Sequence, residues 1–471
     1  MGFDLDSQSR RQLGYRLIDH IDRYFASLPN RAVQLPEAER TFGELRDSLP
    51  QLGEDAARVL DDVCREMIDK GFHVPSANYF GLMNPTPAYV AVLAEALVAA
   101  LNPQLATLAR SQLASKIEQE TVRWIGERVG WKGQFGGTFT SGGNEANFSA
   151  LALALTAIFP GVMDEGLQSI RGAPIVYASS EAHHSLDKSA GLLGLGRKAV
   201  RRIEVGRRIQ INVDALDAAI RKDAAAGRLP FCVVATAGTT NSGAIDDLPA
   251  VAEVCRRHQL WMHVDGAYGA AAIFSDKHRD LVRGIEQADS ITLDPHKWLA
   301  MPFAAGVVLT SHPELLKSAF GVTTPYMPKV NTPLPPDNFA ISTQWTRRTN
   351  ALKLWLTLRI HGRQAYEEHI DRQFQLAFWF AEQIRASTNF VLFTEPMLPI
   401  FNLQLKNSPR EEERSAAKHQ AVVDEVTRDG KQWISTTRVN GQTVIRVMII
   451  SYLTQQRHLE ELLQRLERAA K

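Results

Sequence analysis

The segment Ser290-Ile-Thr-Leu-Asp-Pro-His-Lys-Trp298 joins a short β-rich run to a polar turn that carries Lys297. The apolar and β-branched residues of Ile291–Leu293 are typical of a buried strand. Ligands of open α/β sheets bind at the carboxyl ends of the strands, so we expect Lys297 to lie at a binding site. A neutral lysine amine there can react with an aldehyde, whereas a solvated surface charge is the alternative for this lysine taken alone.

Between about residues 85 and 320, β-rich runs alternate with helical patterns. Segments 213–225 and 249–258 space their apolar residues three or four apart, as helices packed on a sheet do. This alternation predicts an α/β fold with a mainly parallel sheet. The other predicted strands of this sheet are Ile175–Ala178, Phe231–Ala235, Trp261–Val264 and Val307–Thr310.

We divide the chain into three parts: an N-terminal helical arm over residues 1–85, a large domain over 86–345 and a small C-terminal α/β domain over 346–471. The arm has too little strand to stand alone, so we expect it to pack on another part of the protein or on a second subunit. The segments predicted for the small domain are the helices Leu352–Ile360 and Gln364–Ile384 and the strands Ile400–Leu405 and Val444–Ile450, separated by a charged helix.

Composition narrows the class of partner. The chain has 53 basic and 52 acidic residues among 471, so no broad field gathers nucleic acid or a membrane surface. The apolar run Val90–Leu101 is too short to span a bilayer and predicts a buried helix. Three cysteines and an acidic first segment, without a targeting signal, favour the cytoplasm. A small molecule is the expected partner.

A second predicted strand ends on a carboxylate, in the segment Leu260-Trp-Met-His-Val-Asp-Gly-Ala-Tyr268. Asp265 then lies at the same sheet edge as Lys297. A carboxylate beside the nitrogen of a pyridine-type cofactor favours the protonated ring, which is a better electron sink. A helix cap or a surface acid is the alternative.

Glycines precede a helical run in the segment Gly136-Gly-Thr-Phe-Thr-Ser-Gly-Gly-Asn-Glu-Ala-Asn147, which continues as Phe148–Ile158. Backbone N–H groups near glycines and the positive end of a helix together bind phosphate. The spacing matches neither the Walker pattern nor GxGxxG. The segment therefore predicts a phosphate site, with a plain glycine-rich turn as the alternative.

Two histidines follow another predicted strand, in the segment Tyr177-Ala-Ser-Ser-Glu-Ala-His-His-Ser185. His183 can stack on a planar cofactor and exchange protons near neutral pH, although a solvated or capping histidine is the alternative. A histidine pair also suits a metal, but no cysteine or aspartate cluster accompanies it at ligand spacing. We predict no metal site.

Together these segments resemble the group II pyridoxal-phosphate decarboxylases, which include aromatic L-amino acid, histidine and glutamate decarboxylases. The resemblance covers about residues 70 to 360 and includes Ala-Gly-Thr-Thr at 237–240. It implies the fold-type I architecture of aspartate-aminotransferase-like enzymes and pyridoxal 5'-phosphate as cofactor. It also implies a homodimer with active sites at the subunit interface and a small-molecule amino acid substrate.

The resemblance implies a role for each motif residue around the cofactor ring. Lys297 would hold the cofactor covalently, and Asp265 would pair with the pyridine nitrogen. His183 would stack on the ring face opposite Ala267. Thr240 would lie near the hydroxyl side of the ring.

For the phosphate, the resemblance implies binding by Gly143 and Asn144, with His296 nearby. Asp294 departs from the family, because animal members usually have asparagine there. The substitution adds negative charge near the phosphate.

A proline-rich segment at 321–338 predicts an exposed, mobile loop. In the family, a tyrosine on such a loop donates the proton that replaces the departing carboxylate, and Tyr326 matches that position. Members without this tyrosine can form an aldehyde instead. We therefore predict decarboxylation of an L-amino acid to the amine and CO2.

The substrate side matches the family poorly. The turn Asn84-Pro-Thr-Pro87 resembles the pocket edge of aromatic decarboxylases and favours an aromatic substrate. Ala106, Thr107 and Leu108 stand where those enzymes commonly have bulky aromatics. Arg110 either binds an acidic side chain or forms a surface or structural ion pair, so glutamate-, aspartate- and cysteine-sulfinate-type substrates stay open.

The cofactor motifs also allow other reactions. An oxidative aldehyde synthase is one alternative, and an aminotransferase that clamps the substrate carboxylate with Arg347 or Arg348 is another. A non-catalytic binding protein is disfavoured, because a scaffold needs none of the lysine, aspartate, histidine and tyrosine named above.

Overall fold

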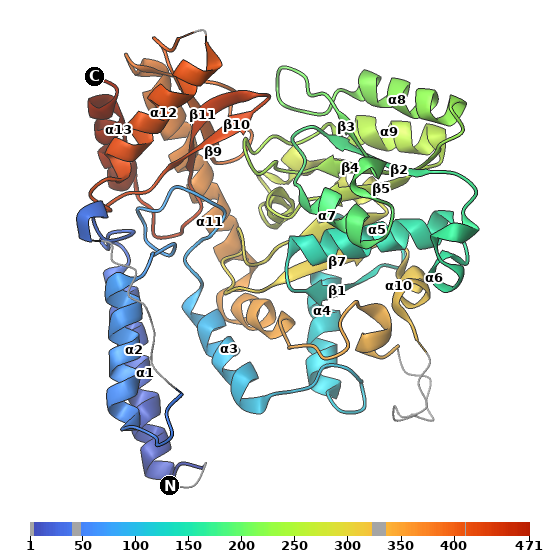
Figure 1. Cartoon of the computed structure of the whole chain (residues 1–471). Coiled ribbons are helices and arrows are strands. Elements are labelled where there is room, and N and C mark those ends of the chain that lie inside the picture. The colour runs from blue at the N-terminus through green and yellow to red at the C-terminus, as the bar shows by residue number, and fades with distance from the viewer. Residues whose placement is uncertain (1–3, 40–48, 323–335, 410) are drawn as a thin grey trace.

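The computed structural model describes residues 4–39, 49–322, 336–409 and 411–471. Two β-sheets organise these residues, with helices around both (Figure 1). The larger sheet has seven strands in the spatial order β1 (Gly136–Thr140), β7 (Gly306–Thr310), β6 (Ser290–Leu293), β5 (Trp261–Asp265), β4 (Leu229–Thr236), β2 (Pro174–Ser179) and β3 (Val200–Ile203).

This sheet is mainly parallel. Strands β6, β5, β4, β2 and β3 run in one direction, whereas β7 pairs antiparallel with both β6 and β1. The predicted α/β class with a mainly parallel sheet is therefore confirmed. Strands β1 and β3 were not predicted.

Side chains of the large sheet alternate between two hydrophobic cores, because successive residues of a strand point to opposite faces. On β4, Cys232 and Val234 belong to the core that α5 and α7 cover. Val233 and Ala235 belong to the core that α8 and α9 cover. Burial on both faces explains why the central strands are almost continuously apolar. The large-domain helices are α3 (Tyr89–Leu101), α4 (Gln112–Val129), α5 (Gly143–Ile158), α6 (Val162–Glu165), α7 (Ser185–Leu192), α8 (Val213–Ala225), α9 (Leu248–His258) and α10 (Pro313–Phe320).

The smaller sheet is antiparallel, in the order β10 (Ser435–Val439), β11 (Gln442–Met448), β9 (Ile400–Leu405) and β8 (Phe390–Leu392). It shares a core with the helices α11 (Ala351–Ala386), α12 (Glu412–Thr427) and α13 (Gln456–Ala469). Gly362 interrupts α11 with a φ of 77°, which agrees with two successive predicted helices. The strand predicted at 444–450 begins and ends two residues earlier.

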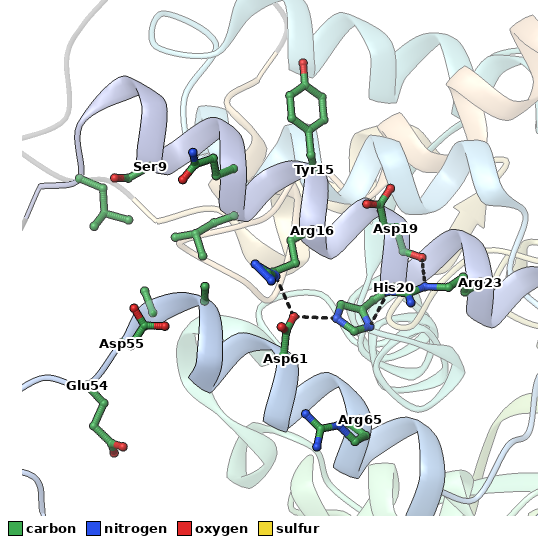
Figure 2. Close-up of a pocket in the computed structure, with 15 residues that line it drawn as sticks. Ser9, Tyr15, Arg16, Asp19, His20, Arg23, Glu54, Asp55, Asp61 and Arg65 are labelled. Carbon is green, nitrogen blue, oxygen red and sulfur yellow. Dashed lines mark hydrogen bonds and ion pairs between the residues drawn. The ribbon is translucent and has the colours of Figure 1, made fainter.

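The N-terminal helices α1 (Ser7–Ser27) and α2 (Ala56–Lys70) form a pair that extends away from the rest of the chain (Figure 1). Figure 2 shows how they meet: Asp61 Oδ1 forms an ion pair with Arg16, 3.0 Å from its Nε, and lies 2.9 Å from His20 Nε2. Neither helix has a buried residue.

The residues that follow the arm helices pack against the C-terminal part of the chain. The Tyr79 ring stacks on Trp433 at 5.3 Å, and Phe80 belongs to the core of the smaller sheet. The division at residues 85 and 345 stays a prediction.

Helix α3 departs from the prediction of a buried helix. Ala91, Ala94 and Val98 are buried. Leu97 and Leu101 expose 46% and 67% of their surface, so within a single chain the prediction is wrong. None of the helices in the described ranges is both long and apolar enough to cross a membrane.

Candidate active site

A cavity of about 230 Å³ opens where the parallel strands of the large sheet end. Strand β4 ends at Thr236 and β5 at Asp265, while Lys297 follows β6 and His183 follows β2. All the site residues predicted from the sequence line this cavity except His296 and Tyr326, and Tyr326 lies outside the described residues. The lining residues are Met83, Gly143, Asn144, Asn147, His183, Thr236, Gly238, Thr240, Asp265, Ala267, Tyr268, Asp294 and Lys297.

The turn that carries Lys297 is held rigidly. The Lys297 side chain is 22% exposed, and its Nζ lies 3.2 Å from Asp294 Oδ2. Next to it, the buried Trp298 indole donates a hydrogen bond to Gln373 of α11. Tyr366 of the same helix donates to the Leu299 carbonyl at 3.1 Å. The lysine is therefore presented to the cavity from a fixed backbone.

Asp265 is 5% exposed and points from the end of β5 into the cavity. Its Oδ2 accepts a hydrogen bond from Asn147 Nδ2 at 2.9 Å, and its Oδ1 accepts one from the Ala267 N–H at 3.2 Å. Two donors on its two oxygens fix the plane of this carboxylate.

His183 faces the cavity from the turn after β2. The Ser185 N–H donates to its Nδ1 at 3.1 Å, so a neutral ring carries its proton on Nε2. Desolvation by the surrounding protein lowers the pKa of His183, and the nearby Lys297 acts in the same direction. The ring is therefore uncharged near neutral pH, which suits stacking on an aromatic ring.

The predicted phosphate segment forms the start of α5. This helix begins at Gly143 rather than at Phe148, so Gly143 and Asn144 lie in its first turn. A Cβ on Gly143 would lie 2.8 Å from Asp294 Oδ2 and 3.3 Å from Ala267 Cβ. Only glycine leaves this cradle open, as a bound phosphate requires.

His296 lies behind that cradle rather than in the cavity lining. Its Nδ1 accepts a hydrogen bond from the Ala305 N–H at 3.1 Å, and its Nε2 lies 3.6 Å from Asp294 Oδ2. Burial lowers the pKa of His296, although the Asp294 charge opposes this effect.

Three buried polar atoms of the cavity residues have no hydrogen-bond partner within the described part of the chain. They are Thr236 Oγ1, Tyr268 Oη and Asp294 Oδ1. Unpaired buried polar atoms are costly, so they indicate a site built for a polar ligand. Together with the glycine cradle and Lys297, they fit pyridoxal phosphate.

Sequence reasoning missed Asn147, Thr236 and Tyr268 as lining residues. It also missed Arg446 of β11, which is 5% exposed and donates from Nη1 to the Thr240 carbonyl at 3.0 Å. Within the described ranges no carboxylate lies within 4.0 Å of its guanidinium. The sequence signal that could have identified Arg446 was a single charged residue inside the apolar segment predicted as the strand Val444–Ile450.

Three other arginines considered from the sequence do not line the cavity of their own chain. Arg347 is buried in an ion pair with Glu118, and Arg348 pairs with Glu95. Arg110 is exposed and lies 3.4 Å from Gln104 Oε1. The described cavity therefore has no arginine clamp of the aminotransferase kind. Among the residues described, no group of three or more His, Cys, Asp and Glu side chains is placed to hold a metal ion.

A lysine after one parallel strand, a carboxylate at the end of its neighbour and a glycine cradle at a helix N-terminus characterise the fold-type I pyridoxal-phosphate enzymes, and we assign the chain to this class. Comparison with known proteins then narrows the assignment. The chain belongs to the pyridoxal-dependent decarboxylase family, whose conserved domain matches residues 36–406.

Curated relatives and solved structures agree with this family. An aromatic-L-amino-acid decarboxylase from Bacillus atrophaeus is 31% identical over 464 residues, which cover 98% of this chain and 94% of the relative. The human cysteine sulfinic acid decarboxylase is 31% identical over 386 residues, covering 81% and 77%. The crystal structure of mouse CSAD superposes with a TM-score of 0.92 at 27% identity, covering 99% of this chain and 100% of that one.

The chain is therefore a pyridoxal-phosphate-dependent amino acid decarboxylase, a carboxy-lyase, and the predicted family, fold and cofactor are confirmed. By their names, its relatives act on aromatic and on acidic amino acids. The residues of the site therefore have to distinguish these two substrate classes.

Proposed function

We propose that the enzyme converts an L-amino acid to the corresponding amine and CO2, with Lys297 as the covalent anchor of the cofactor. The observation that carries this proposal is the convergence of Lys297, Asp265 and His183 on one cavity that also contains unpaired polar atoms. Pyridoxal phosphate, when bound, delocalises the electron pair that the departing CO2 leaves behind.

Other residues of the chain have separate roles in binding the cofactor. Asp265 holds a proton on the ring nitrogen, and the neutral His183 ring packs on the cofactor face. Gly143 and Asn144 bind the phosphate through the first turn of α5, where the helix dipole is positive. Thr240 and Ala267 complete the contact surface, and His296 supports the phosphate cradle from behind.

Asp294 places a carboxylate beside Gly143, where its negative charge opposes phosphate binding. Lys297 Nζ lies 3.2 Å from its Oδ2. We infer that this contact keeps the turn in place until the lysine reacts, after which His296 Nε2, 3.6 Å from Asp294 Oδ2, is the neighbour that remains.

Tyr326 is proposed as the acid that delivers the proton to the α-carbon after CO2 leaves. A positioned acid in a closed site quenches the carbanion before oxygen reaches it, which favours amine over aldehyde. The oxidative synthase thus remains the alternative outcome if Tyr326 does not act in this way.

An aromatic substrate is our first candidate. One relative that matches 98% of this chain is an aromatic-L-amino-acid decarboxylase. Met83 of the cavity lining directly precedes the turn 84–87, which resembles the pocket edge of aromatic decarboxylases.

An acidic substrate is the second candidate, and Arg446 favours it. This buried guanidinium is bonded to the backbone of a cavity residue, yet no carboxylate neutralises it in the described chain. A buried charge without a counterion is costly, and a substrate carboxylate would remove that cost.

We further propose a homodimer in the cytoplasm. On α3 and at the start of α4, Leu97, Leu101 and Leu113 expose 46%, 67% and 72% of their surface, which is typical of a protein–protein contact. Cys64, Cys232 and Cys255 are all unpaired, as expected in a reducing compartment. Light scattering during gel filtration would return twice the mass of 52.3 kDa, and a monomer mass would contradict the dimer.

The proposed function is tested with a panel of aromatic, acidic and sulfur-containing L-amino acids, incubated with purified protein and pyridoxal phosphate. CO2, amine and aldehyde are measured for each, with Lys297→Ala as the inactive control. CO2 with an equal amount of amine supports the proposal. Aldehyde without amine would assign an oxidative synthase, and no CO2 from any substrate would contradict decarboxylation.

A further inference from the structure

A buried hydrogen-bond network lies behind Asp265, and its centre is Asn147 of α5. The amide nitrogen of Asn147 donates to Asp265 Oδ2 at 2.9 Å and to Ser185 Oγ at 2.9 Å. The amide oxygen accepts from Thr292 Oγ1 at 2.7 Å and lies 3.0 Å from His263 Nε2. Asn147 thus uses both donors and both acceptor positions of its side chain.

The network is shielded from water. Asn147 is 1% exposed, and His263 and Thr292 are fully buried on neighbouring strands of the large sheet. In such surroundings a fully satisfied polar network is specific, because any misplaced donor or acceptor loses its partner without gaining water.

The partners of Asn147 permit only one orientation of its amide. Rotating the amide by half a turn would bring its oxygen against the Asp265 carboxylate, where two acceptors would face each other. Burial lowers the pKa of His263, so its ring is neutral and carries a single proton. Ser290 Oγ lies 2.9 Å from His263 Nδ1 and receives the Trp261 indole N–H at 2.9 Å. The Ser290 carbonyl oxygen also lies 3.1 Å from Nδ1, so both ring nitrogens of His263 have partners inside the network.

A continuous chain of hydrogen bonds therefore links Trp261 through Ser290, His263 and Asn147 to Asp265. Its last link is the bond that the Asn147 amide donates to the carboxylate at the cavity. The Ala267 N–H binds the other oxygen of this carboxylate at 3.2 Å.

We propose that Asn147, oriented by His263 and Thr292, is a positioning residue that fixes the Asp265 carboxylate for its bond with the ring nitrogen of pyridoxal phosphate. The inference rests on the proposed role of Asp265. Hydrogen-bond strength depends steeply on angle, so a carboxylate free to rotate about its last torsion binds the ring N–H less well. A weaker bond would leave less positive charge on the ring, so the visible bands of the bound cofactor would interconvert at a higher pH.

The test uses Asn147→Leu, which keeps the approximate side-chain volume and removes both donor and acceptor. Thr292→Val is a milder variant that removes one of the two bonds to the amide oxygen. Ser149→Ala is the matched control, because Ser149 is equally buried on α5 but donates only to the Glu145 carbonyl of its own helix.

Two quantities are measured for each protein: the Kd of pyridoxal phosphate for the apoprotein, and the midpoint pH at which the visible bands of the bound cofactor interconvert. We expect Asn147→Leu to raise the Kd about tenfold or more and to raise the midpoint by about one pH unit, as loss of a hydrogen bond to a charged group implies. Thr292→Val should shift the Kd and the midpoint pH in the same direction, by smaller amounts. Ser149→Ala stays within about twofold of the parent Kd.

A purely structural role for Asn147 would lower the melting temperature of the apoprotein without moving the midpoint pH. A folded Asn147→Leu protein with the parent Kd and midpoint would overturn the inference. If that variant does not fold, the same result for Thr292→Val overturns it. Asp265→Asn separates the two proposals. If neither Asp265→Asn nor Asn147→Leu changes the Kd or the midpoint pH, the proposed role of Asp265 is wrong. If Asp265→Asn changes them and Asn147→Leu does not, only the role of Asn147 is refuted.

Discussion

Arg446 distinguishes the two candidate substrate classes, and Arg446→Met is the change that tests them. Methionine keeps an unbranched, apolar stem of similar length and removes the guanidinium. In the structure this group donates to the Thr240 carbonyl at 3.0 Å and to Ser435 Oγ at 3.3 Å. Its Nε is buried without a partner within the described residues, and Arg446 contacts the cavity lining through Thr240.

The expected effect follows from these contacts. A hydrogen bond between two charged groups is worth about 1.5–3 kcal/mol at a buried site, which corresponds to about a 10- to 150-fold change in kcat/KM. Losing the bond to the Thr240 carbonyl costs about 1 kcal/mol, or about fivefold, for any substrate. The variant should therefore lose at least about tenfold more on an acidic substrate than on an aromatic one.

The assay is steady-state kinetics with cysteine sulfinate and tryptophan, each with saturating pyridoxal phosphate. Arg438→Met is the matched control, because Arg438 lies on the adjacent strand β10 but is exposed. Equal losses on both substrates would show that Arg446 only supports the backbone around Thr240, and the argument for an acidic substrate would be wrong. A parent enzyme that does not act on cysteine sulfinate would contradict the second candidate directly.

Three further predictions address other parts of the chain. Lys297→Ala should bind pyridoxal phosphate without a covalent link, so gel filtration removes the cofactor and its visible absorbance; a retained band would show that another group holds it. Tyr326→Phe should lower amine formation about 100-fold or more while aldehyde appears, as loss of a general acid implies, and full amine output would contradict its role. Burial raises the pKa of Asp246 from 3.8 to about 6, so the folded protein holds this proton more tightly than the unfolded chain. Its contribution to stability is therefore full below about pH 4 and is lost, by about 3 kcal/mol, as the pH rises through 6. Melting temperatures between pH 4.5 and 7 should fall less steeply for Asp246→Asn than for the parent, and parallel curves would refute this assignment.

The success of strand prediction depended on position in the sheet. Every strand predicted from the sequence has neighbours on both sides, and the four that were missed, β1, β3, β8 and β10, are the edge strands of the two sheets. A central strand is buried on both faces and becomes an apolar run that stands out in a sequence. An edge strand borders solvent, so it tolerates glycine, as in β1, or arginine, as in β3.

The motif residues could be placed because their positions follow from local rules. Asp265 and Lys297 come directly after buried strands, and the parallel arrangement brings such ends to one edge of the sheet. The start of α5 was placed five residues late, because glycine and asparagine are poor helix formers and hid its first turn.

The sequence alone determined the enzyme class and placed Lys297, Asp265 and His183 at the cavity, because strand ends and glycine cradles are encoded within a few consecutive residues. Only the tertiary structure decided what supports them. Asn147 meets Asp265 across 118 residues of chain, and Arg446 meets Thr240 across 206. Such contacts depend on how separate elements pack, and a single asparagine or arginine looks the same in a sequence whether it is buried in a network or exposed to water.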